Sequence, residues 1–493
     1  MIKSTVRIIS IAFLVLAVYG QLSARQLTLL YWGDRLAHDL PYVEIVNGET
    51  VQIGGAGALA GMVNAIKAND PHTLVMVAGG EFAGSPVSLL TQGQSQVSIL
   101  NKIGIDAFVP GEYEFAYSWE SLETAMNKAD FPVLLSNVID GGSFKPMFTP
   151  DTLFYLPGVI VGVIGVINPE FKKFVDFDGV LGIGYIDYLP IITEFVKRKR
   201  KSCDVLVVLS YLGWEMDSLL AVQVPGLDVI IGSRGDNPFD PPREVNGVII
   251  ARSGHYGRWL GRLVVNVDTT HGGIINYKGS LLSVEQGQIT IDEEVEKLVA
   301  KLEKKHTKKM NKKIGTLQTD WKIAFDKPSN LAQWAADIMH MIYSKIDLAV
   351  INNGCLMGGL KKGPITELDM WKICPYETPI VITQISGREL NRVLDYLLIK
   401  NGEFITWSGL EILVRNNEVV KYLINGKPVN PSRDYALATT GQVWGNIENH
   451  LRLIRGERPC LFLPGINLRQ VLTDAVRSIE IISNPLDDRW VVE

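Results

Sequence analysis

Apolar runs rich in β-branched residues alternate with longer segments of helical spacing over residues 26–290. Continuous apolar runs of this kind are typical of central strands that are covered on both faces. They lie at 73–78, 159–167, 205–210 and 229–232. Helical spacing fills intervals between them, for example at 58–69 and 186–200. The alternation predicts a layered α/β domain whose functional loops follow the ends of its strands.

A change of pattern marks the end of this domain. Residues 293–313 are rich in Glu and Lys and carry apolar residues at helical spacing. This is typical of a helix with one solvated face, and we interpret its lysine-rich end as solvated surface rather than as a site for polyanions. We predict a first domain at 25–290, a helical linker at 291–318 and a second α/β domain at 319–493. Inside the second domain the pattern predicts helices and a strand at 330–344, 387–398 and 347–351.

The first 24 residues have the pattern of a secretory signal peptide, which we place at 1–24. Lys3 and Arg7 precede an apolar core at 8–18, and small residues follow it. The core is shorter than the stretch of about 20 residues that crosses a membrane. The C-terminus is charged, unlike the apolar tail of a lipid-anchor signal. We therefore expect a secreted, extracellular protein with no membrane anchor.

The net charge limits the kinds of binding partner, and the cysteine count limits the possible disulfides. The formal net charge of −5 argues against nucleic acid and anionic membranes as partners. Four cysteines, an even count, permit two disulfides in three alternative pairings. They are Cys203, Cys355, Cys374 and Cys460. Cys355 and Cys374 lie in predicted loops that can approach each other, and the pairing stays open.

Five segments near the predicted strand ends resemble the metal-binding motifs of the 5′-nucleotidase family. They read Asp34-Arg35-Leu36, Ala78-Gly79-Gly80, Gly111-Glu112-Tyr113, Ser210-Tyr211-Leu212 and Ser233-Arg234-Gly235-Asp236. The family has Asp-x-His, Ala-Gly-Asp, Gly-Asn-His, Ser-His-Leu and Gly-His-Ser at these places. The resemblance implies a metallophosphoesterase-like N-terminal domain and a 5′-nucleotidase C-terminal domain.

Of the family's metal ligands, only Asp34 is retained. Gly80 stands where the family has the carboxylate that bridges the two metals, and glycine has no side chain to replace it. A two-metal phosphatase needs several nitrogen and oxygen ligands that converge on two cations. We therefore predict a degenerate hydrolase with no catalytic residue, no metal of its own and no cofactor. The alternative is an active 5′-nucleotidase or apyrase, hydrolysing extracellular ADP or AMP at a rearranged site of Asp34, Glu112 and Asp236.

The second domain resembles the family's nucleotide-binding domain. Met357 ends a Gly-rich turn where the family has a substrate-binding Arg, so tight nucleotide binding is not expected. Phe404 matches an aromatic residue that stacks on the base, and Trp444 lies in the segment of the second such aromatic. An aromatic face can stack on adenine, so a nucleotide-sequestering protein is a further alternative. The same pattern also fits Phe404 as a core residue.

The tripeptide Arg234-Gly235-Asp236 follows the predicted strand at 229–232. Nearby glycine and proline favour an exposed, turned loop. In such a loop the Asp236 carboxylate would complete the coordination of a divalent cation held by an integrin. Arg234 would pair with an acidic side chain of the same receptor. Gly235 allows the turn that separates the two side chains.

Secreted members of the family are known as salivary apyrases that block platelet aggregation. The resemblance, combined with the lost ligands and the Arg-Gly-Asp loop, predicts a secreted inhibitor of platelet aggregation. It would block fibrinogen binding to the platelet integrin, with adenine nucleotide as a second ligand. Integrin subtype and oligomeric state stay open from the sequence.

Overall fold

The computed structural model describes residues 24–492, apart from 47–48, 174–181, 236, 325–326, 376–377, 401–404, 416–417 and 452–459. The predicted signal-peptide core, Asp236 and Phe404 therefore lie outside the described residues. The chain divides into two compact units, 1–306 and 307–493. This boundary falls inside the predicted linker, and each unit is described by itself.

The first unit contains two sheets. One has five strands in the order β15 (Ile274–Ser283), β14 (Trp259–Asp268), β1 (Ala24–Trp32), β4 (Thr73–Val77) and β5 (Ala107–Phe108). The other has six, in the order β12 (Arg243–Val245), β13 (Val248–Ala251), β11 (Val229–Gly232), β10 (Val205–Tyr211), β8 (Val159–Ile167) and β7 (Asp151–Leu156). The four predicted strands are confirmed, each within one residue of its predicted limits.

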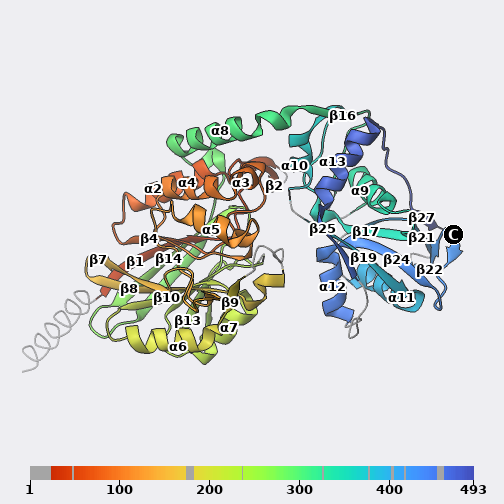
Figure 1. Ribbon diagram of the computed structural model, residues 1–493. Helices are drawn as coiled ribbons and strands as arrows, with labels where there is room; N and C mark the ends of the chain where they lie inside the picture. The colour runs from red at the N-terminus through yellow and green to blue at the C-terminus, as the bar shows by residue number, and fades with distance from the viewer. Residues whose placement is uncertain are drawn as a thin grey trace, which may run out of the picture. The chain divides into compact units, whose positions relative to one another are not determined.

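Alternation along β10 shows how the layers are built. Val205, Val207 and Leu209 pack in the core cluster that contains residues of both sheets. Leu206 and Val208 belong to a second cluster, which they share with α6 (Tyr188–Lys199) and α7 (Trp214–Gln223). The helices α2 (Ala56–Lys67) and α4 (Gln94–Ile103) cover the outer face of the first sheet, and α6 and α7 that of the second (Figure 1). Strands that are buried on both faces explain the continuous apolar runs of the sequence.

Parallel pairing brings the functional loops to one edge of each sheet. Strand β1 runs parallel to β4, and β4 runs parallel to β5. In the second sheet the four inner strands β8, β10, β11 and β13 pair in parallel with one another, and the edge strands β7 and β12 pair antiparallel. The loops that follow β1, β4, β10 and β11 therefore emerge at carboxyl ends, where α/β sheets bind ligands.

Smaller elements complete the first unit. They are the hairpin β2 (Tyr42–Val46) and β3 (Glu49–Ile53), the pair β6 (Val138–Asp140) and β9 (Ile183–Tyr185), and the helices α3 (Pro86–Thr91), α5 (Trp119–Met126) and α8 (Glu293–Thr307).

Helix α8 ends earlier than the helical spacing predicts. Residues Lys308–Asn311 form a 3-10 turn instead. The last residue of the predicted helix, Lys313, begins β16 (Lys313–Leu317) of the second unit, which pairs with β18 (Gly363–Thr366) and β26 (Ile481–Ile482).

The second unit is built on a mixed five-stranded sheet in the order β20 (Ile405–Ser408), β17 (Leu348–Asn352), β24 (Asp434–Thr440), β19 (Pro379–Ser386) and β25 (Cys460–Asn467). Ala349 and Ile351 pack on one face, in the core cluster of α9 (Asn330–Met341) and α13 (Leu468–Ile479). Leu348 and Val350 pack on the other face, in the cluster of α11 (Gly387–Asp395) and α12 (Gly441–Leu451). A four-stranded sheet, β23 (Lys427–Pro428), β22 (Glu418–Ile424), β21 (Leu410–Arg415) and β27 (Trp490–Val492), and the helix α10 (Glu367–Ile373) complete the unit.

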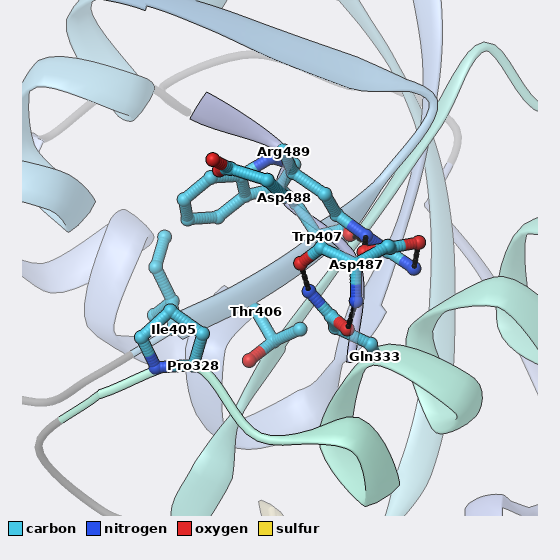
Figure 2. A pocket seen from close by; sticks show the side chains of 8 residues that line it. All are labelled: Pro328, Gln333, Ile405, Thr406, Trp407, Asp487, Asp488 and Arg489. Atoms are coloured by element: carbon cyan, nitrogen blue, oxygen red, sulfur yellow. Dashed lines mark hydrogen bonds and ion pairs between the residues drawn. The ribbon is translucent and has the colours of Figure 1, made fainter. Parts of the chain in front are cut away.

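A small pocket opens beside β20, where the C-terminal segment crosses α9 (Figure 2). Gln333 ties the two together: its amide nitrogen donates to the carbonyl oxygen of Asp487 at 2.7 Å, and its amide oxygen accepts from the Asp487 N–H at 3.0 Å. The pocket volume is about 30 Å³. By this measure a cavity needs about 10–15 Å³ to hold one water molecule, so the pocket has room for a few water molecules.

Within the described residues, no helix is long and apolar enough to cross a membrane. Three cysteines whose side chains are described, Cys203, Cys355 and Cys374, are buried thiols.

Candidate functional site

The five sequence motifs converge around Asp34, at the carboxyl ends of the parallel strands of the first unit. Asp34 follows β1 and is 4% exposed. Its main chain is bonded to the loop after β4, since its N–H donates to the carbonyl of Gly79 at 2.8 Å. The Tyr256 N–H donates to the Asp34 carbonyl at 2.8 Å. The loops are thus joined by backbone bonds before any side chain is considered.

The Asp34 carboxylate accepts hydrogen bonds from three donors of this chain. The Tyr211 hydroxyl donates to Oδ1 at 2.6 Å, and the Ser233 hydroxyl donates to Oδ2 at 2.7 Å. The Arg234 N–H donates to Oδ2 at 2.9 Å. Burial raises the pKa of Asp34, while these hydrogen bonds lower it. The donors take the place of water around a carboxylate that has been removed from solvent.

Tyr211 fills the space between the loops that follow β4 and β5. A Cβ atom at Gly79 would lie 2.8 Å from the Tyr211 ring, and one at Gly111 would lie 2.6 Å from it. Both distances are shorter than van der Waals contact, so the ring packs directly on two glycine backbones. Tyr211 is fully buried, and burial together with Asp34 raises its pKa well above the usual value. The hydroxyl is therefore protonated at neutral pH and donates to Asp34.

Gly80 leaves no room for a side chain. A Cβ atom there would lie 2.3 Å from Asp34 Oδ1, and the residue has a φ of +75°, which favours glycine. A bridging carboxylate at this position would require both the Asp34 side chain and the loop backbone to move. The glycine is therefore a packing requirement of the present site.

Arg234 turns toward the site. Its Nε donates to Glu112 Oε2 at 3.1 Å, and the two side chains are 21% and 12% exposed. Burial raises the pKa of Glu112, while the guanidinium of Arg234 lowers it. Gly235 is exposed, and Asp236 lies outside the described residues. The predicted integrin contacts of Arg234, Gly235 and Asp236 stay a prediction, which requires the Arg234 guanidinium to leave Glu112.

A buried arginine holds the loop that carries Arg234. Arg252 is 1% exposed and donates to the carbonyls of Ser233, Arg234 and Gly235, at 2.9, 2.8 and 3.3 Å. Its Nη1 also pairs with Asp217 at 3.2 Å. The guanidinium fork therefore fixes the loop by its backbone, whatever its side chains do.

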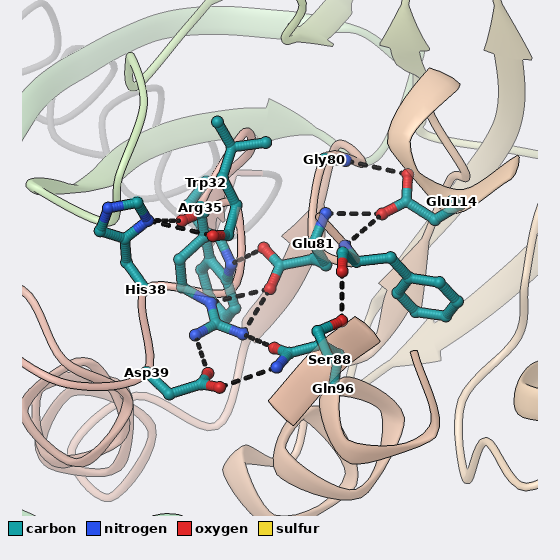
Figure 3. A network of polar contacts seen from close by, with 11 residues as sticks. Trp32, Arg35, His38, Asp39, Gly80, Glu81, Ser88, Gln96 and Glu114 are labelled. Atoms are coloured by element: carbon teal, nitrogen blue, oxygen red, sulfur yellow. Dashed lines mark hydrogen bonds and ion pairs between the residues drawn. The ribbon is translucent and has the colours of Figure 1, made fainter. Parts of the chain in front are cut away.

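A second buried arginine lies beneath the site (Figure 3). Arg35 is 1% exposed and pairs with Glu81 and Asp39, and its Nη2 donates to Gln96 Oε1 at 2.6 Å. The Trp32 indole N–H donates to Glu81 at 3.0 Å. Burial is the largest effect on Glu81 and raises its pKa to about 7, against the lowering by Arg35. The guanidinium balances carboxylates that would otherwise be unpaired in the interior.

Glu114 joins the loops after β4 and β5 (Figure 3). Its carboxylate accepts from the backbone N–H groups of Gly80, Glu81, Phe82 and Gly111, at 3.0, 2.5, 3.1 and 2.6 Å. Figure 3 shows the bonds from Gly80 and Glu81. Charge-assisted bonds of this kind are stronger than neutral ones. Glu114 is fully buried and therefore fixes both loops at the rim of the site.

The side chains around Asp34 do not fit a two-metal centre. In the described part of the chain, no group of three or more His, Cys, Asp and Glu side chains could hold a metal ion. Asp34 is already bonded to three donors, and Glu112 is paired with Arg234. A guanidinium and a protonated phenol are donors, whereas a metal needs acceptor lone pairs. The carboxylates of Asp34 and Glu112 therefore have their partners within the protein.

The predicted nucleotide residues of the second unit do not form an open stacking site in the described region. Trp444 is 4% exposed and packs in the core, so its ring is not available to a base. Met357 is half-buried, and its N–H donates to the carbonyl of Ile373 at 2.6 Å. Phe404 lies outside the described residues, so its role in nucleotide binding stays a prediction.

The sequence motifs did not identify several of the buried charged residues around Asp34. Arg35 and Glu81 follow the ends of β1 and β4 within four residues, Arg252 directly follows β13, and Glu114 lies in the 3-10 turn Glu112–Phe115. This placement is the signal that could have indicated buried ion pairs, because Arg and Glu are almost never fully buried unless they are paired. Their partners depend on long-range contacts and could not be assigned from spacing.

Comparison with known protein families supports the resemblance. The family model described as 5′-nucleotidase, C-terminal domain, matches residues 313–445. The chain is 26% identical to an uncharacterised metallophosphoesterase of Bacillus subtilis, over 71% of this chain and 80% of that protein. It is 24% identical to the 5′-nucleotidase of Vibrio parahaemolyticus, over 86% of each.

Comparison with solved structures gives the same fold. The 5′-nucleotidase precursor of Thermus thermophilus superimposes with a TM-score of 0.74 at 21% identity, covering 95% of this chain and 99% of that one. The predicted two-domain α/β fold, with a metallophosphoesterase-like and a 5′-nucleotidase domain, is confirmed. The narrower resemblance to salivary platelet inhibitors gains no support from these comparisons.

Removal of the Tyr211 hydroxyl tests the hydrogen bonds around Asp34. In Tyr211→Phe the ring still packs on Gly79 and Gly111, but the buried carboxylate loses one of its donors. We expect a loss of about 1–3 kcal/mol in the free energy of unfolding. Urea denaturation measures this loss, with Tyr155→Phe as control because Tyr155 is 72% exposed. Equal midpoints for the two variants would contradict the assigned role.

The burial of Glu81 beneath the site predicts a pH dependence of stability. The folded-state pKa of Glu81, about 7, lies above its ordinary value, so the folded state holds this proton more tightly than the unfolded state. Its contribution is fully present below about pH 4.5 and is lost as the pH rises through about 7. We expect Glu81→Gln to flatten the fall in stability between these values in urea titrations. The exposed Glu123→Gln is the control, and an unchanged slope in Glu81→Gln would refute the prediction.

Proposed function

We propose that this chain, a relative of the 5′-nucleotidases, is a non-hydrolysing binding protein of that fold. Its relatives are named as 5′-nucleotidases and a metallophosphoesterase, so common descent points to phosphohydrolase chemistry. In this chain the corresponding site is filled by side chains that bond to one another. Ligand binding without turnover is the function that this geometry supports best.

The proposal rests on the hydrogen bonds that the Asp34 carboxylate accepts within the chain. The one family ligand that the chain retains accepts from Tyr211, Ser233 and Arg234, with the Tyr211 ring lying on Gly79 and Gly111. A metal at Asp34 would have to displace these donors and leave them buried without partners. Each such loss costs about 1–3 kcal/mol, before any missing ligand is counted. The site is therefore built to keep Asp34 bonded within the chain.

A binding role has a candidate ligand class in the second unit. The match to the 5′-nucleotidase C-terminal domain over residues 313–445 supports a nucleotide or a related phosphate ester. Met357 in place of the family's Arg favours weak binding, because a thioether cannot pair with phosphate. ADP and AMP are the probes that this reasoning selects.

Hydrolysis of 5′-nucleotides is the second candidate function. Relatives that carry the name 5′-nucleotidase cover most of the chain, which favours it. It would require a rearrangement in which Tyr211 leaves Asp34 and Arg234 leaves Glu112. The two candidates differ in one measurable property, which is metal-dependent release of phosphate.

Phosphate release from AMP and ADP, with Mg²⁺, Mn²⁺ or Zn²⁺ added, separates the two candidates. We expect release at the level of a heat-denatured sample, together with less than one equivalent of bound metal by elemental analysis. Calorimetric titration of the same preparation with ADP should show a saturable heat without turnover. Metal-dependent release that disappears in a folded Asp34→Asn variant would overturn the non-hydrolysing assignment and establish the second candidate.

Platelet-integrin binding through Arg234, Gly235 and Asp236 is the narrower hypothesis from the sequence. The exposed Gly235 and the backbone clamp of Arg252 support a loop of fixed shape. The pairing of Arg234 with Glu112 opposes it, because the guanidinium faces the site. An integrin would have to compete with an internal carboxylate for the same side chain.

Binding to purified platelet integrin in Mn²⁺ buffer tests this hypothesis. If the loop is adhesive, Glu112→Gln should bind several-fold more tightly than the unmodified protein, because it releases Arg234 from a charged partner. Asp236→Glu should abolish binding, whereas Asp240→Glu, an exposed position outside the tripeptide, should not. No binding by either the unmodified protein or Glu112→Gln would end the integrin hypothesis.

A further inference from the structure

Two buried cysteines of the second unit lie on chain segments that are bonded to each other. Cys355 ends the short turn Asn353–Cys355 after β17, and Cys374 follows the last residue of α10. They are 2% and 0% exposed and belong to the same hydrophobic cluster. Their common cluster places both thiols in one region of the core.

A backbone hydrogen bond next to both cysteines sets the distance between the segments. The Met357 N–H donates to the carbonyl of Ile373 at 2.6 Å. Cys355 lies two residues before the donor, and Cys374 lies one residue after the acceptor. The bond holds the turn that contains Cys355 against the end of α10, next to Cys374. A disulfide needs Cα atoms about 4.4–6.8 Å apart, which requires two segments that are held together in this way.

The electrostatics of the pair agree with this placement. Burial raises the pKa of Cys355 well above its ordinary value, and the neighbouring Cys374 raises it further. Burial also raises the pKa of Cys374 to about 12, against a lowering by Arg469. Both groups are therefore protonated thiols in the folded, reduced protein. A thiol is a poor nucleophile, so exchange with external disulfides is slow once the core has closed.

The surroundings of Cys374 are fixed by a buried arginine. Arg469 donates to the carbonyls of Cys374 and Pro375 at 3.1 and 3.0 Å, and its guanidinium stacks on the Trp371 ring. The end of α10 is therefore held in place from the side of α13. A cross-link to Cys355 would tie the Gly-rich turn to this fixed point.

We propose that Cys355 and Cys374 form a disulfide during oxidative folding, which fastens the turn at 353–357 to the end of α10. This assignment is independent of the function proposed above. It also commits to one of the pairings that the sequence left open. The oxidant is a small disulfide of the glutathione class, which acts before the two sulfurs are buried.

The chemistry is two successive thiol–disulfide exchanges. The thiolate of one cysteine attacks oxidised glutathione, forms a mixed disulfide and releases one glutathione thiolate. The thiolate of the second cysteine attacks the mixed disulfide at the protein sulfur and releases the second glutathione thiolate. The cysteine pair loses two electrons, one glutathione disulfide gains them, and the two protons pass to the released thiols.

Refolding of the full chain from denaturant tests the proposal. One sample refolds with oxidised and reduced glutathione, and the other refolds with excess dithiothreitol. Digestion without reduction, followed by mass spectrometry, should find the Cys355–Cys374 peptide pair in the first sample only. Folded, reduced protein that is exposed to the same glutathione mixture should form the link at least about tenfold more slowly, because both sulfurs are buried thiols. The bond should raise the midpoint of thermal unfolding of the second unit by about 5–10 °C.

Cysteine variants and the alternative disulfide pairings provide further tests of the proposal. Cys374→Ala should remove the thermal shift between oxidised and reduced samples, whereas Cys203→Ala, in the first unit, should preserve it. If Cys374→Ala does not fold, peptide mapping of the unmodified chain still decides. Absence of the linked peptide after oxidative refolding, or a link from either cysteine to Cys460, would overturn the proposal.

Discussion

A single carboxylate, that of Glu114, holds together the two loops on which the geometry of the site depends. It accepts from four backbone N–H groups, three in the loop after β4 and one in the loop after β5. Backbone donors at these loops cannot pair with each other, and buried donors without acceptors are costly. With the loops held in this way, Gly79 and Gly111 present flat backbone surfaces to the Tyr211 ring. The Tyr211 hydroxyl then reaches Asp34, so that bond depends on Glu114 as well.

Three arginines pair with acidic side chains around the site. Arg35 pairs with Asp39 and Glu81 beneath the loops, and Arg252 pairs with Asp217 behind them. Arg234 pairs with Glu112 at the rim. Guanidinium groups suit these positions because each has several donors in a fixed plane and stays charged. Buried ion pairs of this kind often add little net stability, but removal of one partner leaves an unpaired charge and is costly.

The relatives of this chain and the side chains at its site therefore indicate different functions. The fold and the relatives are those of 5′-nucleotidases and metallophosphoesterases. The residues at the corresponding loops are donors and paired carboxylates, which do not suit metal coordination. A fold can persist while the site on it changes, since function belongs to the site and stability belongs mainly to the packed layers. The continuous apolar strands β8 and β10 form those layers whether or not the loops bind metal.

Sequence alone was sufficient for the strands and the two-domain architecture. Apolar runs such as Val159–Ile167 identify a strand locally, and the residue that stands at a motif position, such as Gly80, can be read directly. What replaces the lost ligands was decided only by tertiary structure. Arg234 has a φ of +73°, its loop is clamped by Arg252, and its side chain pairs with Glu112, a contact that the sequence did not indicate. The partners of Arg35, Tyr211 and Glu114 come from loops that are distant in the chain. Pairing of β1, β4 and β5 in one sheet brings Arg35 and Glu114 to their partners, and packing of the two sheets brings Tyr211 to Asp34.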